Sequence, residues 1–189
     1  MKSIIFITTN KHKVEEVQAV LKDYDIKVEQ QTLEYTEDKE ADMKEVCEKA
    51  AKELANELNK PIIVEDTGLF FKAYNNFPGA LPKFVIQSIG FEGVFRLLKD
   101  KDKSAYFKTV VGYCEPNKEP ILFEDEMHGQ ILDKVVDSEK DAMPYDHIFM
   151  PDGYKKAIVE MSMAEKNSFS QRGKVAKKLG EYLNNPTNY

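Results

Sequence analysis

Residues 42–68, DMKEVCEKAAKELANELNKPIIVEDTG, join the clearest helical pattern of the chain to a short apolar strand. From Met43 to Leu58, apolar residues recur at spacings of three and four, with Lys and Glu between them, which predicts an amphipathic helix. Pro61 ends this helix and begins the strand Ile62–Val64, which we expect to end in the turn Glu65–Gly68. A helix followed directly by a buried strand is typical of an α/β fold.

The segments on either side continue this alternation. The apolar run from Ser3 to Thr8 predicts a buried strand, and Asn10 stands where the cap of a following helix is expected. Further strands are expected over 26–33, 106–113 and 121–132, two short helices over 82–89 and 92–98, and a last helix over 168–183. We therefore expect one domain, residues 1–189, with helices around a twisted mixed sheet.

Composition and charge limit the class of protein. The 189 residues are 42% hydrophobic and 32% charged, which suits a globular interior and excludes wholesale disorder. No stretch approaches the roughly 18 apolar residues of a membrane span, and Ile4–Ile7 is too short for a signal-peptide core, so we expect a cytoplasmic protein without a membrane partner. A net charge of -6 argues against a nucleic-acid partner. Cys47 and Cys114 fit neither a disulfide framework nor a zinc site.

The stretch Thr8-Thr9-Asn10-Lys11-His12-Lys13 leads from the first strand into a helix. Free backbone N–H groups, the positive end of the helix dipole and two lysines suit a phosphate group. No glycine-rich loop accompanies them, so an ordinary helix cap with solvated lysines remains the alternative.

Two carboxylates are candidates for a metal site. Asp66 follows the apolar strand, and Mg²⁺ usually takes one or two protein carboxylates together with substrate phosphates and water. Glu37, before the long helix, could supply a second ligand. The alternatives are a solvated turn at Asp66 and a solvated acidic run around Glu37.

Two later segments combine polar and aromatic residues. In Met143-Pro144-Tyr145-Asp146-His147, the ring of Tyr145 could stack on a base and Asp146 could accept a ring N–H, although aromatics beside proline are often packing residues. We interpret His147 as a surface histidine. In residues 166–174, Ser168 or Ser170 would cap the last helix, and Lys166 and Arg172 could reach a phosphate or a base carbonyl.

In this order, the segments resemble one family, the inosine triphosphate pyrophosphatases, from Ile4 to about Leu183. The motifs that carry the resemblance are TTNKHKVEE (8–16), VEDTGL (64–69), FPG (77–79), YDHIFMPDGY (145–154), AEKN (164–167) and SQR (170–172). The resemblance implies hydrolysis of noncanonical purine nucleoside triphosphates (ITP, dITP, XTP) to monophosphate and pyrophosphate. It also implies an elongated two-lobed α/β fold around a central mixed sheet, a nucleotide cleft between the lobes, and a homodimer.

The resemblance further implies a role for each candidate residue. Mg²⁺, or Mn²⁺ in its place, would be bound by Glu37 and Asp66, and Asp66 would also act in catalysis by helping to activate water. The phosphate-binding residues would be Thr8, Thr9, Asn10, Lys11, Lys13, Lys49 and Thr67. The base-binding residues would be Met143, Tyr145, Asp146, Lys166, Gln171 and Arg172.

The chain departs from the family pattern at three places. Thr9 replaces a usual glycine, Met143-Pro144 replaces a phenylalanine and a small residue, and Gln171 replaces a histidine. Two of these three positions belong to base selection, which leaves room for two other functions. One is a pyrophosphatase of the related fold that acts on pyrimidine or other modified nucleotides. The other is a nucleotide-binding protein without catalysis.

Overall fold

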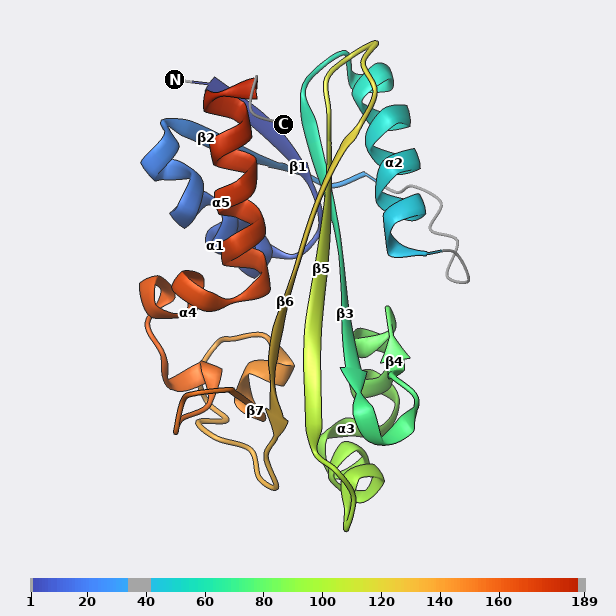
Figure 1. The fold of residues 1–189 in the computed structure, drawn as a ribbon, viewed down its shortest axis with the longest axis vertical. Helices are drawn as coiled ribbons and strands as arrows, with labels where there is room; N and C mark the ends of the chain where they lie inside the picture. Colours follow the sequence, from blue (N-terminus) through green and yellow to red (C-terminus); the bar gives the residue numbers. More distant parts are fainter. Residues whose placement is uncertain (1, 34–41, 187–189) are drawn as a thin grey trace. The chain divides into compact units, whose positions relative to one another are not determined.

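The computed structural model describes residues 2–33 and 42–186, in which the strands form one mixed seven-stranded sheet (Figure 1). The strand order is β2-β1-β3-β5-β6-β7, with β4 paired to β3. The strands are β1 (Lys2–Ile7), β2 (Ile26–Gln31), β3 (Ile62–Phe71), β4 (Phe77–Gly79), β5 (Ser104–Cys114), β6 (Ile121–Ile131) and β7 (Phe149–Pro151). The helices are α1 (Lys11–Leu21), α2 (Met43–Leu58), α3 (Pro82–Leu98), α4 (Met163–Phe169) and α5 (Gln171–Asn184). Short 3₁₀ turns are η1 (Lys22–Tyr24), η2 (Lys72–Tyr74), η3 (Pro144–His147) and η4 (Ile158–Glu160).

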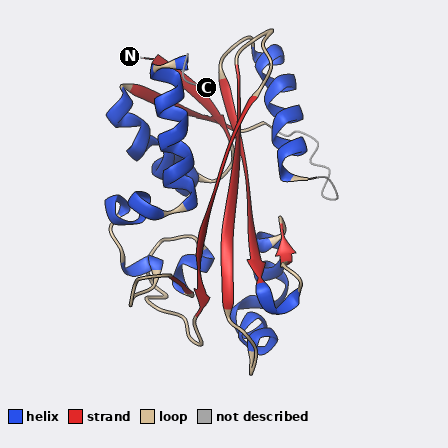
Figure 2. Cartoon of the chain, in the orientation of Figure 1, coloured by secondary structure: helices blue, strands red, loops and turns tan. Residues whose placement is uncertain are grey.

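The chain forms two compact units, each with strands and helices. Figure 2 shows the helices and strands along the chain. The first unit comprises the described residues of 1–67, 109–125 and 167–189, and the second comprises 68–108 and 126–166. Strands β3, β5 and β6 and helix α4 contribute residues to both units. The predicted α/β class, with a mixed sheet and flanking helices, is confirmed. That residues 1–189 make a single domain stays a prediction.

In the first unit, α1 and α5 pack on one face of parallel strands. Strand β1 pairs in parallel with β2 and with β3, with Phe6 opposite Ile63. Phe6 and Leu21 are fully buried and Leu179 nearly so, in one core formed by these strands and both helices. In Figure 1, α1 and α5 lie on one side of the strands and α2 lies on the other.

Helix α2 fits tightly against β5 within the first unit. The Cys47 thiol donates to the Val110 carbonyl at 3.5 Å. A Cβ atom at Gly112 would lie 2.6 Å from the Cys47 carbonyl oxygen, so this position accepts only glycine without a backbone shift. The ends of α2 agree with the sequence pattern, because the Asp42 side chain accepts from the Lys44 N–H and Asn59 adopts the left-handed conformation after the last turn.

In the second unit, α3 and β7 pack beside the long strands. Helix α3 is interrupted at Gly90, where φ is 63°, and this break separates the two short helices that the sequence predicts. Strand β7 pairs antiparallel with β6. The rings of Phe107 and Phe149 lie 4.9 Å apart in its core.

Three sequence predictions are wrong in detail. Strand β3 does not end at Glu65 but continues to Phe71, because Leu69 and Phe71 beyond the predicted turn are fully buried. The last helix is divided into α4 and α5, and the Ser170 hydroxyl, not that of Ser168, caps α5 by accepting from the Gly173 N–H at 3.1 Å. His147 is buried rather than a surface residue, with its Nδ1 atom 2.9 Å from the Val136 carbonyl.

None of the helices within residues 2–33 and 42–186 combines the length and the apolar composition that crossing a bilayer requires. The cytoplasmic location stays a prediction.

Candidate active site

The start of α1 places two lysines at a capped helix end. The Asn10 side chain caps the helix by accepting from the His12 N–H at 3.0 Å, and the Thr8 hydroxyl accepts from the Asn10 N–H at 3.1 Å. Lys11 is exposed, and Lys13 follows it in the same turn. The first turn of α1 holds no acidic residue, so neither lysine is neutralised from within it. This end of the helix suits an anion.

Lys13 connects the start of α1 to strand β3. Its Nζ atom lies 3.1 Å from Glu65 Oε1. The lysine side chain is 19% exposed, whereas that of Glu65 is fully buried. The contact therefore places one ammonium group between solvent and a buried carboxylate.

Behind Lys13, Arg172 binds two buried carboxylates. Its Nε and Nη2 atoms each donate to Glu65 at 2.8 Å, and Nη1 donates to Glu16 at 2.7 Å. The Thr67 hydroxyl donates to Glu65 at 2.7 Å and lies 2.8 Å from the Thr109 hydroxyl. We call Glu16, Glu65, Thr67 and Arg172 the carboxylate–arginine cluster, and all four residues belong to the first unit.

The charges of the cluster stabilise each other. Burial alone would raise the pKa of Glu65, but the charges of Arg172 and Lys13 outweigh it and hold that pKa well below its ordinary value. Burial likewise opposes the charge on Arg172, and Glu65 and Glu16 raise its pKa above the usual range. Both groups are therefore ionised at neutral pH.

Asp66 follows Glu65 in β3 and is half-buried, as expected when successive side chains of a strand alternate between faces. Burial and the charge of Asp66 raise the pKa of the Cys47 thiol to about 12, so this thiol is protonated at neutral pH. Asp66 offers a hard carboxylate oxygen of the kind that Mg²⁺ prefers. In the described part of the chain, no three His, Cys, Asp or Glu side chains gather in a way that could hold a metal. The second predicted ligand, Glu37, lies outside the described residues.

In the second unit, the predicted base-binding residues are tied together at η3. Asp146 Oδ2 accepts from Lys166 Nζ at 2.6 Å, and both side chains are close to nine-tenths buried. The Asp146 N–H donates to the Met143 carbonyl at 2.9 Å. The Tyr145 hydroxyl donates to the Pro82 carbonyl at 3.1 Å, and burial raises the pKa of this phenol. Tyr145 is a packed residue in this state, with 6% of its surface exposed.

Gln171 and Arg172 belong to the first unit, at the start of α5. Gln171 is 5% exposed, and its Oε1 atom is buried without a hydrogen-bond partner among the described residues. The guanidinium of Arg172 lies on Glu65 and Glu16, and its predicted base contact stays a prediction. Thr9, Lys11 and Lys49 are exposed, and their predicted phosphate contacts stay predictions.

Sequence reasoning missed Glu16, Glu65 and Thr109. The sequence predicts Glu65 as part of a turn, although this residue directly follows three apolar residues that are fully buried. Glu16 precedes the core residue Val17 in α1. An acidic residue inside an apolar pattern is the signal that could have found both.

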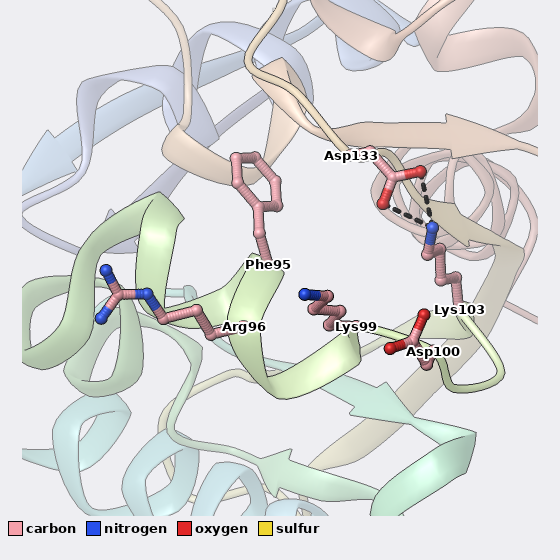
Figure 3. Close-up of a pocket in the computed structure, with 6 residues that line it drawn as sticks. All are labelled: Phe95, Arg96, Lys99, Asp100, Lys103 and Asp133. Atoms are coloured by element: carbon pink, nitrogen blue, oxygen red, sulfur yellow. Dashed lines mark hydrogen bonds and ion pairs between the residues drawn. The ribbon is translucent and has the colours of Figure 1, made fainter.

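A separate cavity of about 270 Å³ lies in the second unit (Figure 3). Within it, Lys103 donates to both carboxylate oxygens of Asp133. Its lining residues are Phe95, Arg96, Lys99, Asp100, Lys103 and Asp133. None of the predicted site residues that the structure describes lines it.

Fold and site together define an α/β protein with a cationic helix start beside a strand that carries paired carboxylates. The chain belongs to the Ham1 family, whose sequence model matches residues 4–182. It is 36% identical to a dITP/XTP pyrophosphatase of Methanopyrus kandleri over 96% of both chains. It is 37% identical to a dITP/XTP pyrophosphatase of Methanosarcina mazei, over 97% of this chain and 98% of that protein. The resemblance found in the sequence is confirmed.

Solved structures share the fold. A HAM1 protein from Coxiella burnetii superimposes with a TM-score of 0.78 at 26% identity, covering 97% of this chain and 98% of that one. The Ham1 protein of Staphylococcus aureus gives a TM-score of 0.76 at 21% identity, over 98% of this chain and 100% of that one.

Proposed function

We propose that this protein hydrolyses noncanonical purine nucleoside triphosphates, namely ITP, dITP and XTP, to the monophosphate and pyrophosphate. The observation that carries the proposal is the contact of Lys13 with Glu65, which joins a cationic helix start to the strand that carries Asp66. Relatives that are 36% and 37% identical over nearly the full chain are named dITP/XTP pyrophosphatases, which supports this substrate class.

The start of α1 would hold the triphosphate. Lys13 and the backbone N–H groups at the start of α1 would be fixed donors toward the negative charge that develops on the phosphates, so they would need no reorganisation during the reaction. Thr67 lies beside Glu65 and would assist at the phosphates. The remaining phosphate contacts in this proposal are Thr8, Thr9, Asn10, Lys11 and Lys49.

Asp66 would bind Mg²⁺, or Mn²⁺ in its place, together with Glu37. The bound cation would neutralise phosphate oxygens and lower the pKa of a coordinated water. The Asp66 carboxylate would orient the water that attacks the α-phosphorus in line with the leaving pyrophosphate. No covalent intermediate is needed.

The base would be recognised by polar groups that the fold already holds in place. Asp146, fixed by Lys166 at 2.6 Å, would accept a ring N–H of the base. Gln171 brings a buried amide oxygen that has no partner among the described residues, so it offers an acceptor as well as two N–H donors. Met143, Tyr145 and Arg172 complete the proposed base-binding set.

The experiment that tests this function is pyrophosphate release from ITP, dITP, XTP, ATP and GTP, each with and without Mg²⁺. We expect turnover of the first three in the presence of Mg²⁺. Faster turnover of pyrimidine or other modified nucleotides would favour the related pyrophosphatase, and tight ITP binding without turnover would favour a binding protein.

We further propose a homodimer, formed through an apolar surface on residues 77–89. Four large side chains are exposed there: Phe77 at 44%, Leu81 at 36%, Phe84 at 63% and Ile89 at 41%. Lys83 is the single charged residue of this segment, so a second copy would meet little like-charge repulsion. Light scattering on the purified protein is expected to give twice the 21.7 kDa chain mass, and Phe84→Glu is expected to give the monomer.

A further inference from the structure

We propose that Glu65 is a positioning residue, which fixes the Lys13 ammonium so that its remaining N–H donors face the phosphates. This inference rests on the proposed function, because it assigns the triphosphate to the start of α1. It concerns how the lysine is held rather than which groups touch the substrate.

The Glu65 carboxylate is itself held from several sides. Oε1 accepts from Thr67 Oγ1 at 2.7 Å and from Arg172 Nη2 at 2.8 Å, and it lies 3.1 Å from Lys13 Nζ. Oε2 accepts from Arg172 Nε at 2.8 Å. A bidentate guanidinium and a hydroxyl therefore lock the carboxylate independently of Lys13. An anchor that does not move can fix a flexible side chain.

Lys13 is the member of this group that reaches solvent. Its side chain is 19% exposed, against 3% for Glu16, 0% for Glu65 and 3% for Arg172. An ammonium group has three donors, so a contact with one carboxylate oxygen leaves two for an anion. Lys13, in the first turn of α1, therefore contacts the buried Glu65 and still reaches solvent.

Charge balance keeps the anchored lysine attractive to a phosphate. Two carboxylates, Glu16 and Glu65, share the single guanidinium of Arg172. The bidentate contact lets Arg172 neutralise much of the negative charge of Glu65. Glu65 therefore neutralises only part of the positive charge of Lys13. The two carboxylates carry two negative charges, and Arg172 and Lys13 carry two positive charges. These four groups are therefore neutral together, so the ammonium can approach the buried carboxylate without creating a net buried charge.

The functional consequence is preorganisation. A free lysine side chain loses rotamer freedom when it grips a ligand, and a side chain already held in place loses less. We expect removal of the anchor to weaken phosphate binding by about two- to tenfold. The effect should appear in KM for ITP, with kcat changed less, because the anchor acts before the chemical step.

The test is a double-mutant cycle with inorganic tripolyphosphate as the probe, measured by calorimetry in Glu65→Gln, Lys13→Met and the double variant. If Glu65 acts through Lys13, Glu65→Gln raises the Kd for tripolyphosphate about two- to tenfold in the wild-type background. In the Lys13→Met background, Glu65→Gln leaves this Kd unchanged. An equal effect in both backgrounds would overturn the proposal, and so would no effect in either.

Two further variants separate positioning from folding. Glu16→Gln is the matched control, because Glu16 is a buried carboxylate on the same guanidinium, and we expect it to lower stability without the coupling to Lys13. If Glu65→Gln does not fold, Glu65→Asp replaces it in the cycle, since it keeps the charge and draws the carboxylate back from Lys13 by one methylene. Wild-type protein that releases no pyrophosphate from ITP would defeat the proposed function. Turnover of ITP without coupling in the cycle would defeat the positioning role alone.

Discussion

Two neighbouring carboxylates of β3, Glu65 and Asp66, sit in opposite surroundings. Glu65 is buried among cations, and Asp66 is half-buried outside the cluster. We expect Asp66→Asn to keep the fold and to lose ITP hydrolysis by about a hundredfold or more, because the variant loses charge where water and metal would be held. Pyrophosphate release and circular dichroism measure the two effects. Turnover near that of the wild type would remove Asp66 from the proposed mechanism.

Arg172 illustrates a residue whose surroundings could not be read from its motif. Replacing it with Ala would remove the guanidinium that the buried Glu16 and Glu65 share and leave Lys13 beside Glu65, so we expect a loss of about 3–5 kcal/mol in the free energy of unfolding. Lys13→Ala is the control, because Glu65 keeps Arg172 and the site of Lys13 is partly open, and its loss should be clearly smaller. Urea unfolding compares the two variants. Equal losses of unfolding free energy in the two variants would contradict the role of Arg172 as the main cation of the cluster.

Gln171 determines how sharply the base is discriminated in the proposed function. Its amide can donate to a keto oxygen or accept from an amino group, whereas a histidine there becomes a dedicated donor when protonated. We expect Gln171→His to raise the kcat/KM ratio of ITP over ATP by about tenfold, most strongly near pH 6. The ratio measured across about pH 6 to 8 is the readout, with Gln171→Ala as the control. An unchanged kcat/KM ratio of ITP over ATP would show that Gln171 does not contact the base.

At the level of elements, the helices were the easiest to predict. The spacing of apolar residues predicted α2, and residue type predicted the cap at Asn10. The extent of β3 was missed because Glu65, Asp66, Thr67 and Gly68 favour a turn locally, while the strands beside β3 keep them extended. The cluster was missed for a similar reason, since Arg172 lies 107 residues from Glu65 in the sequence and no local pattern connects them.

The N-terminal cap of α5 can be tested by substitution. Ser170 is buried, and its hydroxyl accepts from the Gly173 N–H at 3.1 Å. We expect Ser170→Ala to lower the free energy of unfolding by about 0.5–2 kcal/mol, because the cap is lost. Ser168→Ala is the matched control, since this exposed serine is not the cap of α5, and its cost should be smaller. Thermal unfolding of both variants would show a reversed order if the cap were misplaced.

For the whole molecule, buried acids with raised pKa values set the alkaline limit of stability. Burial raises the pKa of Cys47 from 9.0 to about 12, and it raises those of Tyr113 and Tyr145 above their usual 10. The folded protein holds protons there that the unfolded chain releases. The contribution of these protonated groups to the free energy of unfolding is therefore fully present below about pH 9. It is lost as the pH rises toward about 12. Urea midpoints between about pH 8 and 11 should fall progressively, and Cys47→Ala should reduce the fall nearest pH 9. A flat profile would contradict this.

The path of the chain between the two units has a consequence for synthesis on the ribosome. It passes from one unit to the other after residues 67, 108, 125 and 166, and each passage lies within β3, β5, β6 or α4. The second unit is thus translated in full while the first still lacks residues 167–189, which include α5. Arg172 emerges 107 residues after Glu65. Until α5 arrives, Glu65 has Lys13 beside it but lacks its bidentate partner, so the docking of α5 completes the buried ion pairs of the first unit.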